Sequence, residues 1–212
     1  MGRGVASHDA PDRRRGTGPD AGDGQGGEPG WYEVHEVVES IAENSVDAVT
    51  ASLFWASLAG APGVLAHRAV NTLDAMVGHR DDRYERFGWA SARLDDLVNL
   101  LPARLTALAV ACVRPRAATT VWRVVRRDAP AHPSPNGGVV EAAFAAALGV
   151  RLGGENRYGD VVQDRGTLGD GPPPGPGDIA AAVRLRRHIT AAVALGCVGL
   201  QLVVHASRRR SR

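Results

Sequence analysis

The sequence contains no lysine, since all 25 of its basic residues are arginine. This absence excludes a P-loop, whose lysine holds nucleotide phosphates, and any enzyme that forms a Schiff base through a lysine amine. Only two cysteines are present, Cys112 and Cys197, and both lie in apolar stretches without metal-ligand spacing. We interpret them as buried free thiols rather than as a disulfide or part of a zinc site.

A strong net charge is also missing, because 25 basic residues nearly balance 23 acidic ones and leave +2. Such a balance gives no reason to expect nucleic acid as a partner. The first thirty residues have few large apolar side chains and no signal-peptide core, so they cannot fold by burying surface. We therefore divide the chain into a disordered leader (1–30), a membrane domain (31–206) and a basic tail (207–212).

Three apolar segments stand in an alanine-rich background, at residues 48–66, 98–113 and 189–206. The third approaches the roughly 20 residues that cross a bilayer as a helix. The second is shorter and contains Pro102 and Arg104, and the first is interrupted by GAPG at 60–63. We predict an all-α fold, a polytopic membrane helical bundle with interfacial or re-entrant helices and cytoplasmic polar loops.

Arginine is concentrated between these segments, with five in residues 68–96 and eleven in residues 114–188. Positively charged loops favour the cytoplasmic side of a membrane. A full crossing by residues 98–113 would separate the two loops, so we expect that segment to re-enter the bilayer or to lie in its interface. The chain is expected to be a multi-pass protein of the cell membrane, with the orientation of its last helix left open.

Polar blocks adjoin the apolar segments, and ionisable groups in such places mark functional sites by default. In the helix predicted at 34–49, Glu39, Glu43 and Asp47 are four residues apart and share one face. Like charges at that spacing repel each other. We expect something to offset the repulsion: a divalent cation, an arginine from another helix, or water on a solvated face.

The next block places Asn71, Asp74 and His79 at helix-compatible spacing. Asn71 and Asp74 lie one turn apart and can share a cation or a polar ligand. Mg²⁺ takes oxygen ligands and keeps several waters, so two or three side chains suffice. His79 can equally cap the end of its helix, and Asp95 and Asp96 can either pair with nearby arginines or belong to the same site.

A stiff loop, HPSPNGG at 132–138, leads into a helix predicted at 139–150. Its prolines fix the backbone, its glycines allow close approach, and a helix N-terminus offers N–H groups to a phosphate or carboxylate. The residues expected to contact such a ligand are His132, Ser134, Asn136, Gly137 and Gly138. Ser134 or Asn136 can instead be the helix cap, and the two roles are compatible.

These blocks occur together, and in this order, in the CobD/CbiB family of cobalamin-biosynthesis membrane proteins, which the chain resembles from about residue 34 to about residue 206. The string GGENRYG at 153–159 is similar to that family's GG.N.YG and adds Asn156 and Tyr158 as ligand contacts. Its composition alone predicts a turn-rich polar loop. Family members normally carry a long N-terminal region with membrane segments and a VGRDT-like block, so the chain looks like their C-terminal portion joined to an unrelated leader.

The resemblance implies a carbon–nitrogen ligase of adenosylcobalamin (vitamin B12) biosynthesis. This enzyme joins an aminopropanol unit, free or phosphorylated, to adenosylcobyric acid through an amide and makes adenosylcobinamide (phosphate). The reaction class implies ATP and Mg²⁺, and the partners are the corrinoid, aminopropanol or its phosphate, membrane lipid and other late enzymes of the pathway. On this interpretation the catalytic groups are Glu43, Asp74, His79 and Asp95. The metal ligands are Glu39, Glu43, Asp47, Asn71 and Asp74.

Two other functions fit the sequence. A Mg²⁺-dependent membrane transferase acting on a diphosphate also has Asn/Asp-rich helices at the membrane surface, but it usually has two Asp-rich motifs, and Asp95-Asp96 would have to be the second. Alternatively, the shortened chain is an inactive fragment that scaffolds partner enzymes. An in-frame upstream segment encoding further apolar helices would argue against this last function.

Overall fold

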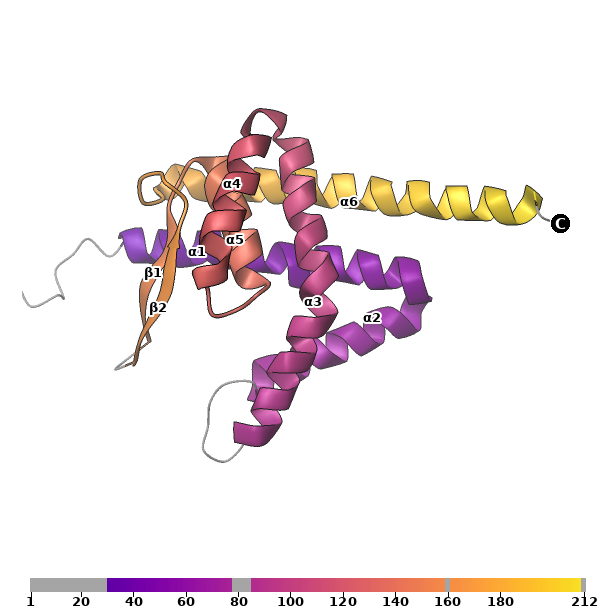
Figure 1. The fold of residues 1–212 in the computed structure, drawn as a ribbon, viewed down its shortest axis with the longest axis horizontal. Helices are drawn as coiled ribbons and strands as arrows, with labels where there is room; N and C mark the ends of the chain where they lie inside the picture. The colour runs from indigo at the N-terminus through magenta and orange to yellow at the C-terminus, as the bar shows by residue number, and fades with distance from the viewer. Residues whose placement is uncertain (1–29, 78–84, 159–160, 211–212) are drawn as a thin grey trace, which may run out of the picture.

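The computed structural model describes residues 30–77, 85–158 and 161–210, and these are mostly helical (Figure 1). The predicted all-α class is confirmed, with one two-stranded hairpin added to it. The helices are α1 (Gly30–Asn44), the π-helical turn η1 (Ser45–Thr50), α2 (Ala51–Val77), α3 (Glu85–Val113), α4 (Ala118–Asp128), α5 (Gly137–Leu148) and α6 (Pro176–Arg210). The strands are β1 (Leu152–Tyr158) and β2 (Val161–Leu168), and 3-10 turns at Pro115–Ala117 and Ala129–Ala131 flank α4.

The first helices run on without a break from α1 through η1 into α2, until the backbone turns at Gly60. Gly60 adopts φ 64° and ψ −151°, which favours glycine, and Pro62 cannot donate to the helical ladder. Gly63 lies against the preceding turn, where a Cβ would be 2.7 Å from the carbonyl oxygen of Trp55. The GAPG interruption is therefore a sharp bend, after which α2 returns beside α3 (Figure 1).

Helix α3 is longer than the apolar segment 98–113, because the polar block before that segment is helical as well. Pro102 lies inside this helix. One face is buried and mostly small, and the other is exposed and apolar. The buried face includes Ala103, Ala107 and Val110, and the exposed face includes Leu94, Leu97, Leu101 and Leu108. In Figure 1, α3 crosses α1 and α6 instead of running along them; its re-entrant or interfacial placement stays a prediction.

Helix α5 is the centre of the fold. Residues 138–145 are all buried, and α5 contacts α1, α3, α4 and α6. Its alanines let these neighbours approach closely, and Phe144 is fully buried among them. The helix ends at Gly149 (φ 74°), where the N–H groups of Gly149 and Val150 donate to the Ala145 carbonyl at 2.9 and 3.0 Å. The helix expected at 139–150 is present, two residues earlier.

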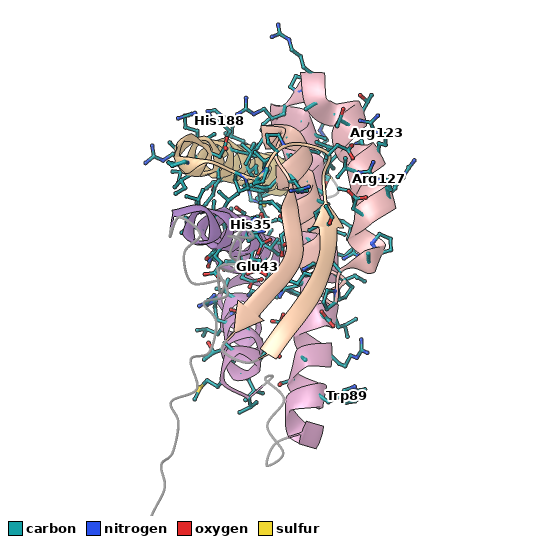
Figure 2. The ribbon with its side chains drawn as sticks, turned by 90° about the vertical axis from the view of Figure 1, so that its left-hand side faces the viewer. His35, Glu43, Trp89, Arg123, Arg127 and His188 are labelled. Carbon is teal, nitrogen blue, oxygen red and sulfur yellow. The ribbon has the colours of Figure 1, made fainter. Side chains whose placement is uncertain are left out.

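Helix α4 is amphipathic and links the helical core to the hairpin. Val121 and Val124 are buried, while Arg123 lies on the exposed face, at the edge opposite His188 of α6 in Figure 2. At its end, Asp128 accepts the Gly169 N–H at 2.9 Å. The hydrogen bonds from the neighbouring Arg127 guanidinium hold the pKa of Asp128 below its usual range.

The segment expected to be a turn-rich loop is instead an antiparallel hairpin, and this expectation was wrong. Leu152 and Leu168, which pair in register, are both fully buried and anchor the hairpin to the core. Gly153 takes φ 72°, and a Cβ there would be 2.0 Å from the Gly166 carbonyl oxygen. The glycines therefore allow a β-bulge and a close strand approach, which composition alone did not distinguish from a loop.

Helix α6 spans 35 residues and changes character along its length. Its first half packs against the core through Ala182, Leu185 and Ile189, while Leu195 and Leu202 in the second half are exposed. In Figure 1 this second half projects beyond the other elements. Three described helices are long and apolar enough to cross a membrane: Val34–Val77, Gly88–Val113 and Pro176–Arg210. The chain therefore has the features of a membrane protein.

We expect the chain to stay in the membrane fraction after high-salt and carbonate washes. Changing both Val198→Arg and Leu202→Arg should weaken this retention, because each arginine in the middle of a membrane helix costs about 3 kcal/mol on insertion scales. The control is His205→Arg, near the end of α6, where arginine can reach the interface. Recovery of the unaltered chain in the soluble fraction, without detergent, would contradict the expectation.

Candidate functional site

A polar cavity of about 210 Å³ lies where α1, η1, α2, α3 and the loop before α5 meet. Its lining contains four carboxylates and no basic side chain among the described residues. The lining residues are Glu43, Val46, Asp47, Asp74, Asp95, Asn99, Ser134, Asn136, Gly137 and Val140. The polar blocks singled out in the sequence therefore converge on one place, although 97 positions separate Glu43 from Val140.

The π turn shapes the wall that carries Glu43 and Asp47. Ser45 and Thr50, both buried, turn their hydroxyls to the backbone: Ser45 donates to the Ile41 carbonyl at 2.7 Å and Thr50 to the Ser45 carbonyl at 3.0 Å. The second bond spans the five-residue step of a π-helix. Such turns are often found at functional sites, and this one lies directly beside the cavity.

Residues of α2 and α3 form a hydrogen-bonded chain along another wall. His67 Nε2 lies 2.9 Å from Asn99 Oδ1, and Asn99 Nδ2 donates to Asp95 at 3.0 Å. Asn71 Nδ2 donates to the other oxygen of Asp95 at 3.4 Å. Asp74, also on α2, lines the same cavity. Asp96 faces away and pairs loosely with Arg93 at 3.9 Å, so only one of the two adjacent aspartates belongs to the site.

The HPSPNGG loop closes the cavity, but its backbone donors are engaged. Ser134 Oγ accepts the N–H groups of Asn136 and Gly137 at 3.3 and 3.1 Å, and the Ser134 carbonyl accepts that of Gly138 at 3.2 Å. Ser134 is therefore the helix cap. An anion would have to compete with these bonds, so phosphate binding by the loop stays a prediction.

The side chain of Asn136 does not cap its helix. Its Oδ1 accepts from Arg104 Nη1 at 2.6 Å, and its Nδ2 donates to the Asp96 carbonyl at 2.8 Å. Both partners belong to α3, so Asn136 ties the loop to that helix. The cavity wall formed by the loop is held in place from outside the loop.

Glu39 and His132 lie behind the cavity wall and are not among its lining residues. Glu39 is buried, accepts the Gly153 N–H at 2.7 Å, and meets His35 Nε2 at 2.7 Å and Arg165 Nη1 at 3.9 Å. Figure 2 shows His35 and Glu43 behind the hairpin strands. The sequence left open whether a cation, an arginine or water offsets the repulsion among the acidic residues of α1. In the structure an arginine from another element does so, because Arg165 also reaches Glu43 at 3.8 Å.

His132 faces the wholly buried Glu141, with 3.5 Å between His132 Nε2 and Glu141 Oε1. Burial, and then the nearby charges of Glu39 and Glu43, raises the pKa of Glu141 well above its usual range. Burial also lowers the pKa of His132. Gly138 makes room for this pair, since a Cβ there would be 2.5 Å from the His132 Cβ. The loop's histidine and second glycine therefore pack the α5 N-terminus.

Three predicted residues cannot be placed on the cavity. His79 lies outside the described residues. Asn156 and Tyr158 fall in β1, in register with Gln163 and Val161, and their side chains lie outside the described part of the chain. Asn71 supports Asp95 but does not itself line the cavity.

Four functional neighbours were missed from the sequence: His67, Asn99, Arg104 and Arg165. Helical spacing could have found two of them, because His67 precedes Asn71 by four residues and Asn99 follows Asp95 by four. Arg104 and Arg165 act through contacts between distant elements, which no local pattern indicates.

The lining suits a cation more than a bare anion. Four carboxylates with no described basic residue among them favour an ammonium group or a hard metal ion. Within the described residues, no three His, Cys, Asp or Glu side chains converge closely enough to hold a metal ion as a ready cage. Mg²⁺ commonly uses one or two carboxylates plus water and phosphate oxygens, so the donor set fits that mode and not a dedicated cage.

Comparison with known proteins decides the family. A family model described as "CobD/Cbib protein" matches residues 34–186. This chain belongs to the CobD/CbiB family. The polar blocks and all the residues that line the cavity lie inside the matched region, so family membership and site geometry concern the same part of the chain. No solved structure matches significantly.

Curated relatives carry the name "Cobalamin biosynthesis protein CobD". The protein of Mycobacterium tuberculosis H37Rv is 53% identical over 169 residues, covering 77% of this chain and 53% of the relative. That of Rhodobacter capsulatus is 51% identical over 168 residues (79% and 53%), and that of Chromobacterium violaceum 48% over 172 residues (80% and 54%). The chain spans about half the length of these relatives.

Removing the Ser134 hydroxyl, which caps α5, should lower the free energy of unfolding without changing the carboxylates that line the cavity. Ser134→Ala should lower the free energy of unfolding by about 1 kcal/mol, because two N–H groups at the start of α5 lose their acceptor. Ser134→Thr, which keeps the hydroxyl, is the control. Thermal or denaturant unfolding in detergent measures both, and equal stability of the alanine variant and the wild type would contradict the capping role.

Glu141→Gln should change how stability depends on pH. With its pKa raised in the folded state, Glu141 keeps its proton to higher pH there than in the unfolded chain, where it ionises above about pH 4.5. This group therefore lowers stability as pH rises above that value. Glutamine mimics the neutral acid, so the variant should gain stability over the wild type as pH increases from 5 to 8. A constant difference across that range, measured by unfolding, would show that Glu141 is ionised in the fold.

Proposed function

We propose that this chain acts in cobalamin biosynthesis and forms the amide that converts adenosylcobyric acid to adenosylcobinamide (phosphate). The observation that carries the proposal is the cavity lined by Glu43, Asp47, Asp74 and Asp95, in a membrane-type helical frame whose relatives are named for cobalamin biosynthesis. The amide product needs an amine, and an ammonium group matches an acidic cavity.

The reaction has requirements that these residues meet. A carboxylate must be activated, for which phosphoryl transfer from ATP is the usual route. The ammonium group must lose one proton to become the attacking amine, and its nitrogen loses a second proton as phosphate leaves and the amide forms. The lining carboxylates would hold the aminopropanol ammonium group and one of them would take the first proton, while the leaving phosphate takes the second. Exposed arginines of α4, such as Arg123 and Arg126, offer bidentate recognition of anionic groups, although α4 does not line the cavity.

A bound Mg²⁺ would supply charge neutralisation for the phosphate groups. One or two of the lining carboxylates Glu43, Asp47 and Asp74 would hold it together with water and phosphate oxygens, since no three acidic side chains of the described residues converge as a cage. Glu39 is occupied by His35, Gly153 and Arg165, and the Asn71 amide by Asp95 and Arg68, so neither is placed to add a ligand. The metal set proposed from the geometry is therefore smaller than the set expected from the sequence.

The volume of the cavity limits which of the substrates can enter it. About 210 Å³ accommodates an aminopropanol unit but not a corrin ring with its side chains. The corrinoid therefore binds outside the cavity, with only its reacting carboxyl group entering. We further propose a multi-pass arrangement in the cell membrane with the site on the cytoplasmic side, supported by the arginines at 114, 116, 123, 126 and 127.

A Mg²⁺-dependent transferase acting on a diphosphate is less well supported. Such an enzyme usually has a second Asp-rich motif, and here Asp96 pairs with Arg93 and does not line the cavity. The scaffold alternative predicts no dependence of any reaction on the cavity carboxylates. The same experiment separates both from the amide-forming enzyme.

The test is conversion of adenosylcobyric acid by membranes containing the chain, supplied with ATP, Mg²⁺ and aminopropanol or its phosphate. Asp74→Asn should lower turnover by about 100-fold or more, because it removes a cavity carboxylate while keeping its shape. Asp170→Asn is the matched control, since Asp170 is exposed and pairs with Arg127. Equal turnover of the two variants, or none from the wild type, would overturn the proposal.

A further inference from the structure

A buried polar chain leads from His67 to the cavity. His67 and Asn99 are only 2% and 1% exposed, although both carry polar side chains on largely apolar helices. His67 comes from α2, and Asn99 and Asp95 come from α3. The chain therefore crosses between two helices before it reaches a cavity carboxylate.

The orientation of the chain follows from hydrogen-bonding rules. Asp95 accepts from the Asn99 amide nitrogen at 3.0 Å, so the Asn99 amide oxygen points the other way, toward His67. His67 Nε2, 2.9 Å from that oxygen, must then donate. Its Nδ1 is buried without a hydrogen-bond partner among the described residues, which suits a lone pair better than an N–H. His67 is thus the Nε2–H tautomer.

The two oxygens of Asp95 are both held. Oδ2 accepts from Asn99 and Oδ1 from Asn71 at 3.4 Å, one from its own helix and one from α2. With both oxygens held, the carboxylate cannot rotate freely about its last bond. Its remaining lone pairs are left for whatever occupies the cavity that it lines.

We propose that His67 is a positioning residue: by locking the Asn99 amide it fixes the Asp95 carboxylate in the orientation the reaction uses. His67 is not among the residues that line the cavity, so it acts through Asn99 and not on the substrate. This inference rests on the proposed amide-forming function for its effect on turnover, but the coupling between the residues can be measured without it.

The competing explanation is that His67–Asn99 only joins α2 to α3. If the contact only held the two helices together, any variant that weakens the packing of α3 would have the same effect on turnover, whether or not the change acts through Asp95. A control variant for that effect is Thr106→Val, because Thr106 is buried on α3, bonds the Pro102 carbonyl at 3.0 Å, and is not part of the cavity lining.

The experiment compares His67→Leu, which removes the donor at similar bulk, with His67→Gln, which can still donate to Asn99. Turnover per folded molecule is measured for each, alone and combined with Asp95→Asn, together with thermal unfolding of all variants. His67→Leu should lower kcat on the order of 10-fold, His67→Gln should recover much of it, and Thr106→Val should leave kcat unchanged.

The double variant decides the mechanism. If His67 acts through Asp95, adding His67→Leu to Asp95→Asn should lower kcat no further, and the two shifts in unfolding temperature should be smaller together than their sum. Independent, multiplying losses in kcat would overturn the inference, as would wild-type kcat in His67→Leu. If the wild type makes no product, the proposed function has failed, and additive shifts in unfolding temperature would then overturn the coupling itself.

Discussion

Carboxylates buried within an apolar helical frame are the constraint on which the rest of this structure depends. A carboxylate removed from water must find donors or a cation, since it cannot be left alone at low dielectric. Glu39 finds them in the hairpin, and Asp95 finds them in two asparagines. The hairpin, the π turn and the loop before α5 are therefore parts of one arrangement that keeps charge inside the fold.

This arrangement separates acidic groups that support the cavity wall from those that line the cavity. Glu39 and Glu141 lie off the lining and meet Arg165 and His132, whereas Glu43, Asp47 and Asp74 line the cavity, and Glu43 meets Arg165 as well. The lining carboxylates present negative potential to a small volume, so that affinity for a cation comes from pre-organisation.

Helical spacing was sufficient to predict which polar residues share a helix face. Glu43 and Asp47 share a face because of their four-residue spacing, and Asp74 and Asp95 lie on the neighbouring helices α2 and α3. Glu43 and Asp74, both expected among the metal ligands, line one cavity, whereas Glu39 and Asn71 from the same expected set do not. The all-α class and the long C-terminal helix were predicted for the same reason, since both depend on local periodicity.

What the sequence could not show is which partner each polar group meets across the fold. Glu39 has the same spacing and chemistry as Glu43, yet its partner Gly153 lies 114 residues later in the chain. The hairpin was missed because its glycines serve a bulge, which by composition resembles a turn. Asn136 was read as a cap or ligand contact, but its amide bonds α3, a choice decided by packing alone.

The π turn at Ser45–Thr50 has a consequence for the length of the chain at this point. Each residue of a regular helix advances the direction of its side chains by about 100°. Deleting one residue here would restore the regular helix and rotate everything before the turn relative to everything after it. The wall that carries Glu43 and the wall that carries Asp74 could then no longer face the same space, so this segment can accept substitutions one at a time but not a change of length.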